Sequence, residues 1–213
     1  PPILSGLVGS EMCIRDRRRR GLTKINYGTE RRDTTFGNNG WFRGFRRDAN
    51  CGNQDTRLRN AFSMGIDRVN TNDTTDDRIY VADHRGRKIV MLNVDGECQG
   101  VIWPGFRPLS MTIRNIDGTA YLIAAGSNRR RIYSAQLDSD TGMPTANAGL
   151  CSTAGNEVWR ITHSIGIAMD GQDGTPSFLY ATGWGDINRY PLVAVGDRFC
   201  PQARDVVYAH DND

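Results

Sequence analysis

The residues best suited to chemistry in this sequence are basic side chains that gather in predicted loops. We predict that nine of them bind a partner from one face of the fold: His84, Arg85, Arg87, Lys88, Arg107, Arg129, Arg130, Arg131 and His163. The planar guanidinium of arginine binds carboxylate and phosphate groups through two parallel hydrogen bonds. These residues therefore indicate an anionic partner: an acidic protein segment, a sulfated or carboxylated glycan, or nucleic acid. The plainer interpretation is a set of solvated loop charges.

The two histidines in this set, His84 and His163, allow a second kind of chemistry. Loop histidines that share a face can hold a metal ion that activates a substrate. No spacing motif joins the two residues, so we assign no catalytic residue and expect no cofactor. Loops 72–77 and 170–173 are rich in Asp, as calcium sites are, but they lack calcium-loop spacing and turn formation explains them. Both an enzyme and a binding module stay open.

The net charge of +3 does not by itself predict a partner. The first 20 residues hold five arginines against Glu11 and Asp16, and from Gly21 onward 22 basic and 22 acidic residues cancel. The prediction of a basic face therefore depends on how the fold sorts these charges.

The elements that must carry these loops are β-hairpins that recur along the chain. Residues 78–98 read RIYVADHRGRKIVMLNVDGEC, which is an apolar run, a polar turn, a second apolar run and an Asp-Gly turn. Cysteines close successive units of this kind, at positions 51, 98, 151 and 200. Their spacing of 47, 53 and 49 residues predicts a repeat architecture with a period of about 50.

Each repeat contains four short predicted strands. In the clearest repeat they cover residues 63–67, 79–82, 88–94 and 101–103. Four antiparallel strands in about 50 residues are typical of a propeller blade, so we predict an all-β fold: a β-propeller, or a propeller fragment, of about four blades. In a blade, the connection from the second to the third strand and the connection to the next blade emerge on one face. The basic loop residues fall on that face, and most acidic loop residues fall on the other.

The predicted blades occupy residues 63–109, 110–163 and 164–213, with a partial blade in 22–62. Further strands are expected at 23–27 and 41–45, and a closing strand at 205–209. Residues 1–21 are predicted to be non-native or disordered. Within residues 1–17, SGLVGSEMCIRDR resembles the peptide obtained when sequencing-adapter DNA is translated. We therefore expect a fragment of a larger propeller.

The motifs SMGIDR and RIYVADHRGRKIVMLNVDG, in residues 63–96, resemble NHL-type β-propeller repeats. The resemblance fades elsewhere, since Ala125 and Gly183 stand where Asp83 would recur. It implies protein binding, RNA binding or, as in related six-bladed propellers, lactonase or lyase activity. We expect a non-catalytic scaffold whose basic loop face binds an acidic protein segment or an anionic glycan. The alternatives are a hydrolase or lyase with a metal near the central channel, and an NHL-like RNA-binding module.

The four evenly spaced cysteines raise the question of disulfides. If they occupy equivalent positions on the outer strands of adjacent blades, their Cα atoms lie beyond the roughly 7 Å that a disulfide permits. We therefore expect packed free thiols rather than a disulfide framework. No apolar run approaches the roughly 20 residues that span a bilayer, so no membrane span is predicted, and the compartment cannot be read.

Overall fold

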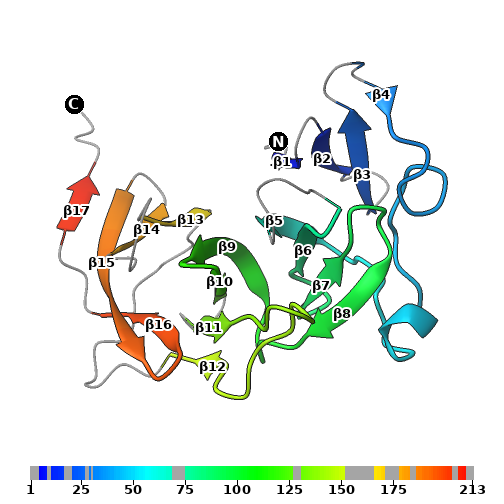
Figure 1. Ribbon diagram of the computed structural model, residues 1–213. Helices are drawn as coiled ribbons and strands as arrows, with labels where there is room; N and C mark the ends of the chain where they lie inside the picture. The colour runs from blue at the N-terminus through cyan, green and yellow to red at the C-terminus, as the bar shows by residue number, and fades with distance from the viewer. Residues whose placement is uncertain are drawn as a thin grey trace. The chain divides into compact units, whose positions relative to one another are not determined.

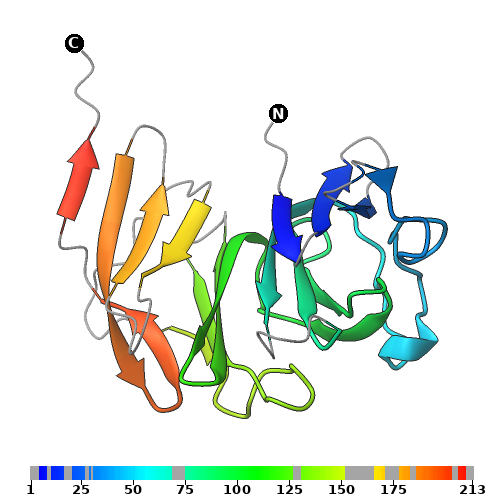
Figure 2. The same ribbon diagram turned by 45° about the horizontal axis from the view of Figure 1, so that its top comes forward.

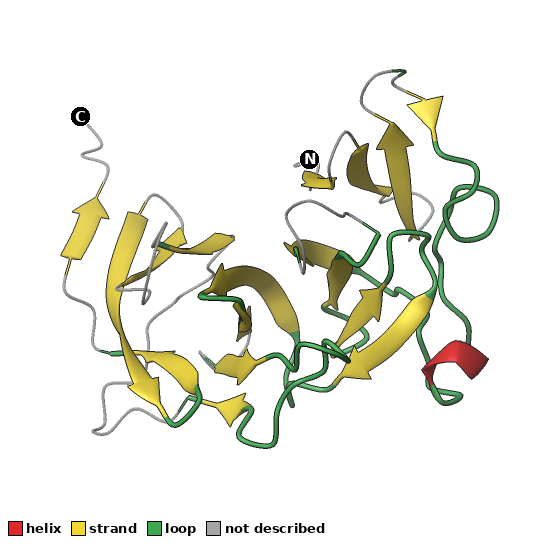
Figure 3. Cartoon of the chain, viewed as in Figure 1, coloured by secondary structure: helices red, strands yellow, loops and turns green. Residues whose placement is uncertain are grey.

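The computed structural model describes most of the chain between residues 5 and 209. The described residues are 5–8, 11–16, 21–26, 29, 31–68, 75–126, 131–151, 166–170, 178–182, 186–202 and 206–209. They form antiparallel strands and one short 3-10 helix, η1 (Ala49–Cys51), drawn in red in Figure 3. The strands belong to two compact units, an N-terminal unit (Pro1–Arg107) and a C-terminal unit (Pro108–Asp213). The all-β prediction is confirmed.

The N-terminal unit holds two four-stranded antiparallel sheets, coloured blue to green in Figure 1. The first contains β1 (Ser5–Val8), β2 (Glu11–Asp16), β3 (Gly21–Asn26) and β4 (Arg31–Arg32). The second contains β5 (Ala61–Asp67), β6 (Arg78–Asp83), β7 (Lys88–Leu92) and β8 (Cys98–Ile102). In each sheet the strands follow one another in chain order, as expected for a propeller blade.

The sheet β5–β8 is the clearest repeat, and the strands predicted there are confirmed. Val81 pairs with Val90 at the centre of the β6–β7 hairpin. Every residue of β7 and all but the first residue of β6 are buried, which explains why these strands lack polar alternation. Figure 2 shows the four strands side by side from a second direction.

The C-terminal unit repeats this arrangement. One sheet contains β9 (Pro108–Ile116), β10 (Thr119–Gly126), β11 (Ile132–Gln136) and β12 (Gly149–Leu150). The other contains β13 (Gly166–Met169), β14 (Phe178–Thr182), β15 (Asp186–Val195) and β16 (Arg198–Pro201). The predicted closing strand exists as β17 (Val206–Ala209), but it is not the fourth strand. It pairs with the first half of β15, while β16 pairs with the second half.

The N-terminal segment differs from the sequence-based expectation at residues 41–45 and in the strands found within residues 1–21. Residues 41–45 form no strand, because positive-φ residues at Gly40 and Gly44 interrupt the extended backbone. Phe42 makes only an isolated bridge to Leu22. Strands β1 and β2 lie in the segment 1–21, and the foreign origin of residues 1–17 stays a prediction.

The cysteine prediction was wrong, since two disulfides join Cys51 to Cys98 and Cys151 to Cys200. The Cα atoms of the two pairs are 5.8 and 5.6 Å apart, within the range that a disulfide needs. The four cysteines do not occupy equivalent positions. Cys51 lies in η1, which packs against β8, where Cys98 is the first residue. Each bond therefore joins a connecting segment to an outer strand.

The disulfides predict a defined mass change. Alkylation after reduction should add four more alkyl groups than alkylation of the unreduced, denatured protein, because four thiols are bound in pairs. The double variant Cys51→Ser/Cys98→Ser should gain only two on reduction and should lose about 3 kcal/mol of unfolding free energy, since it releases a long loop in the unfolded chain. Intact-mass spectrometry and urea unfolding provide the two measurements. An equal uptake before and after reduction would contradict the pairing.

Candidate functional site

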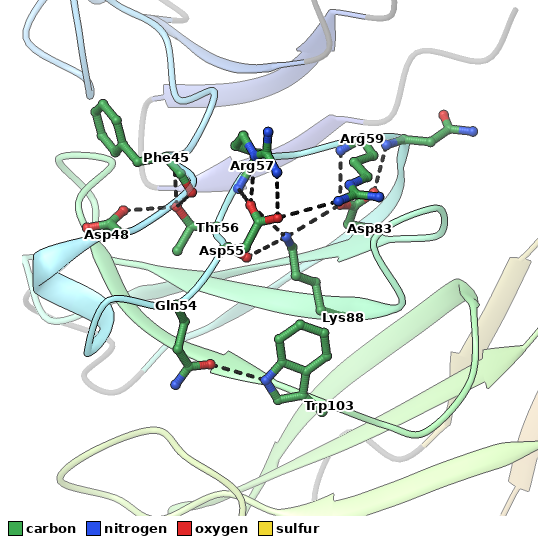
Figure 4. A network of polar contacts seen from close by, with 11 residues as sticks. Phe45, Asp48, Gln54, Asp55, Thr56, Arg57, Arg59, Asp83, Lys88 and Trp103 are labelled. Carbon is green, nitrogen blue, oxygen red and sulfur yellow. Dashed lines mark hydrogen bonds and ion pairs between the residues drawn. The ribbon is translucent and has the colours of Figure 1, made fainter.

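Two segments of the N-terminal unit that are distant in sequence lie side by side at the end of the β6–β7 hairpin. One is the turn 84–87, and the other is the segment 55–60 that leads into β5 (Figure 4). The His84 backbone N–H donates to the Asn60 carbonyl at 2.9 Å, which ties the two together. The sequence analysis placed these two kinds of connection on one face of a blade, and in this sheet they meet.

Asp83 holds this junction in place. Its side chain is fully buried, and its two oxygens accept hydrogen bonds from the backbone N–H groups of Arg59 at 2.9 Å and Asn60 at 2.7 Å. The turn wraps so closely around the carboxylate that a Cβ at Gly86 would collide with it. Arg87 completes the turn with a φ of 58°, in the left-handed region that few residues adopt. Asp83 therefore binds the backbone of the segment 55–60 and packs against the backbone of the turn 84–87.

Lys88, which the sequence analysis placed on the partner-binding face, is only 1% exposed. Its ammonium group donates to the Asp55 carbonyl oxygen and lies 3.7 Å from the Asp55 carboxylate and 4.0 Å from that of Asp83. Burial lowers the pKa of Lys88, and the two carboxylates partly oppose that shift. Lys88 thus links the hairpin to the segment 55–60 and is not available to a partner.

Asp55 connects this buried network to the exposed arginines. Its two carboxylate oxygens accept from Arg57 Nε and Nη2, both at 2.9 Å, and one of them lies 3.5 Å from Arg59 Nη2. The hydrogen bond from Arg57 is the main reason that the pKa of Asp55 is well below its ordinary value, and the charge of Lys88 adds to the effect. Asp55 thus orients two arginines at the surface.

Four exposed arginines surround this junction, and we call them the basic turn cluster: Arg57, Arg59, Arg85 and Arg87. The nearby carboxylates that the structure describes, Asp55 and Asp83, are engaged with the backbone, Lys88 and the cluster itself. The surface here is therefore cationic. Sequence reasoning overlooked Arg57, although the alternation Asp-Thr-Arg-Leu-Arg in 55–59 was a usable signal, because alternate residues of an extended segment share one side.

The structure brings only part of the predicted partner-binding set together. Arg85 and Arg87 are exposed in the turn, and His84 is half-buried, with its ring edge-on to Phe62 at 5.3 Å. Arg107 is exposed at the end of the N-terminal unit, and Arg131 is half-buried in the C-terminal unit. Arg129, Arg130 and His163 lie outside the described residues, so the expectation that His84 and His163 share a face stays a prediction.

The part of the chain that the structure describes shows neither a metal-binding group of side chains nor a membrane-spanning helix. No group of three or more His, Cys, Asp or Glu side chains there could hold a metal ion, although the two Asp-rich loops lie mostly outside this part. Among the same residues, no helix has the length and apolar character needed to cross a membrane.

Comparison with solved structures defines the fold class as the β-propeller type. One similar structure is an exo-β-1,3-galactanase from Phanerochaete chrysosporium, determined with β-1,3-galactotriose; it is 13% identical, the match covers 94% of this chain and 49% of that chain, and the TM-score is 0.55. Another is Kuenenia stuttgartiensis hydrazine synthase, which is 11% identical, with 98% of this chain and 48% of that chain covered and a TM-score of 0.55. A functionally unknown protein from Desulfotomaculum acetoxidans is similar as well: it is 10% identical, the match covers 98% of this chain and 56% of that chain, and the TM-score is 0.56.

This chain spans about half the length of those structures. At such low sequence identity the similarity shows the fold alone. No protein-family model and no curated protein matched the sequence, so the resemblance to NHL-type repeats is supported only at the level of the propeller fold.

The buried position of Asp83 predicts a large effect on stability. Asp83→Ala should reduce the unfolding free energy by about 3–5 kcal/mol, because it leaves two partly buried backbone N–H groups without their acceptor and buried Lys88 without one of its carboxylates. Asp95→Ala, an exposed aspartate at the turn between β7 and β8, is the matched control and should change it by no more than about 0.5 kcal/mol. Urea unfolding measures both, and equal effects would show that Asp83 is not a structural anchor.

The lowered pKa of Asp55 predicts an acid-dependent stabilisation. A carboxylate whose pKa is lower in the folded state than its ordinary 3.8 stabilises the fold above that value, and the benefit is lost as the pH falls below it. The difference in unfolding free energy between the wild type and Asp55→Asn should therefore be constant from neutral pH down to about 5 and then shrink toward about pH 2. Urea titrations across this range test it. A difference that does not vary with pH would contradict the ionic origin.

Proposed function

We propose that this chain is a non-catalytic interaction module of the β-propeller type, whose basic turn cluster binds an anionic glycan. The observation that carries the proposal is the presentation of four exposed arginines from two segments that Asp83 and Lys88 lock together. Because the backbone under the arginines is fixed, binding costs little conformational entropy there. Planar cations spaced along such a backbone suit sulfate or carboxylate groups repeated along a chain.

The chemistry of arginine favours binding over turnover at this surface. Its guanidinium stays protonated throughout the physiological range, so it attracts anions without exchanging protons. The hydrogen bond to Asp55 raises the pKa of Arg57 further. A surface of this kind stabilises charge in a partner and is a poor general acid or base.

The two disulfides support a glycan as the partner. Disulfides persist in oxidising compartments, such as the extracellular space, where sulfated and carboxylated glycans are abundant. The finer part of the proposal is an NHL-like module in which Arg107, Arg129, Arg130, Arg131 and His163 also contact the anionic partner. An acidic protein segment and RNA are the competing partners, and a metal-dependent hydrolase or lyase is the competing function.

The basic turn cluster can be tested with a charge-removal variant. Arg85→Ala/Arg87→Ala should weaken binding to heparin by roughly five- to thirtyfold, because each exposed charge contributes about 0.5–1 kcal/mol. Arg46→Ala/Arg47→Ala removes two exposed arginines elsewhere in the same unit and should leave the affinity within about twofold. Isothermal titration at low and high salt measures both effects, and the wild-type affinity should fall as salt rises.

The same titration distinguishes the competing partners. Polygalacturonate probes carboxylated glycans, polyglutamate stands in for an acidic protein segment, and oligouridylate stands in for RNA. Stronger binding to polyglutamate or oligouridylate than to both glycans would reject the glycan. Binding that is insensitive to salt, or equal losses in the two double variants, would reject the basic turn cluster itself.

A further inference from the structure

A cleft of about 560 Å³ lies in the N-terminal unit, in a part of the structure that the basic turn cluster does not use. It is lined by residues 37–39, 41–45, 48 and 50, together with residues 96–98 at the start of β8. The lining residues between 37 and 50 belong to the long segment that connects β4 to β5. This segment runs from residue 33 to 60 and contains only η1 as regular structure (Figure 3). A connection of this length inside a compact unit is commonly functional.

Aromatic rings form one part of the cleft wall. Phe45 is 57% exposed, Trp41 is half-buried and Phe42 is buried. The guanidinium of Arg32 lies 5.2 Å from the centre of the Trp41 ring and restrains that ring. Aromatic faces carry negative charge density and attract the weakly positive C–H groups of a ligand that lies flat on them.

Amide and carboxylate groups form the rest of the wall. Asn38, Asn39 and Asn50 each offer a donor and an acceptor on one planar group. Two adjacent hydroxyl groups of a ligand can also donate and accept, so they can bind the N–H and the C=O of one side-chain amide at the same time. The lining contains one cation, Arg43, and two carboxylates, Asp48 and Glu97, so it provides no excess of positive charge for an anion.

The cleft is preorganised by bonds within its own wall. Asn38 and Trp41 exchange backbone hydrogen bonds of 2.9 and 3.2 Å. Buried Asp48 accepts from the Asn50 backbone N–H at 3.2 Å and from the Thr56 hydroxyl at 2.9 Å. The Cys51–Cys98 disulfide then fastens η1 to β8 at the cleft edge. Such fixation lowers the entropy lost when a ligand binds.

We propose that this cleft binds an uncharged pyranose residue of a glycan. A pyranose has an apolar C–H face for Phe45 and Trp41 and a rim of hydroxyl groups for the asparagines, and the cleft volume lies in the range of small-ligand sites. The site is separate from the basic turn cluster and does not depend on the proposed function. It requires no charge on the ligand, whereas the basic turn cluster requires it.

Saturation-transfer NMR tests the site with the full chain and a mixture of methyl β-D-galactopyranoside, methyl β-D-glucopyranoside and methyl β-D-xylopyranoside at millimolar concentration. We expect transfer to at least one of these sugars, strongest at the protons of one ring face. Phe45→Ala should weaken binding roughly five- to tenfold by removing an aromatic platform. Asn39→Gly should also weaken it, because it removes an amide while keeping the left-handed backbone that Asn39 adopts at φ 52°.

Two controls separate the cleft from other sites. Trp103→Ala removes an aromatic side chain that is 54% exposed in the same unit but is not among the cleft residues, and it should leave sugar binding unchanged. Arg85→Ala/Arg87→Ala should leave it unchanged as well, even if that variant loses heparin binding. Circular dichroism and urea unfolding confirm that each variant is folded.

Three results would overturn the proposal. The first is no transfer to any of the three sugars in the wild type. The second is an equal loss in Trp103→Ala and Phe45→Ala, which would place the sugar elsewhere. The third is transfer only to methyl glucuronide or to a short-peptide mixture added in parallel, which would show that the cleft selects a charge or a peptide.

Discussion

The buried carboxylate of Asp83 is the interaction on which the N-terminal unit depends most. Burying a charged group is costly unless its oxygens are hydrogen-bonded, and Asp83 meets this condition with the backbone N–H groups of Arg59 and Asn60. Because those groups belong to the segment entering β5, one side chain fixes both the end of the β6–β7 hairpin and the start of the sheet. Lys88 then extends the network to Asp55.

This network explains why the same region can present charge at its surface. The buried ions, Asp83 and Lys88, are used for the fold, while the exposed ions, Arg85 and Arg87, extend from a turn that the buried pair holds rigid. Asp55 connects the buried ions to the exposed ions, since its carboxylate contacts both Lys88 and Arg57. A change in the buried network should therefore alter the surface, whereas the exposed arginines can change without loss of the fold.

The segment 33–60 is stabilised in a different way from the sheets. It gains almost no support from strand pairing and is held by a disulfide, isolated bridges and side-chain hydrogen bonds instead. Freed from the regular geometry of a sheet, it places aromatic rings and amides around a cleft. The unit thus has two surfaces of distinct chemistry: a cationic one at a tight hairpin, and one along an irregular connection that is lined by aromatic and amide groups and has no excess of positive charge.

The sequence by itself determined the β-hairpins and their repetition, because these follow from local signals. The apolar runs of β6 and β7, the Asp95-Gly96 turn and the spacing of the cysteines were enough to predict the strands and the fold class. The exposure of Arg85 and Arg87 could also be predicted from the sequence, since a short polar turn between two buried strands must face solvent.

Only the tertiary structure decided which groups meet across long stretches of chain. Lys88 looked like its neighbours in the turn, and its burial depends on Asp55, 33 residues away. The disulfide between Cys51 and Cys98 spans 47 residues and exists because η1 packs on β8, which no periodic pattern encodes. The aromatic cleft arises for the same reason. Local patterns specify strands and turns, whereas the packing of an irregular segment depends on the whole unit.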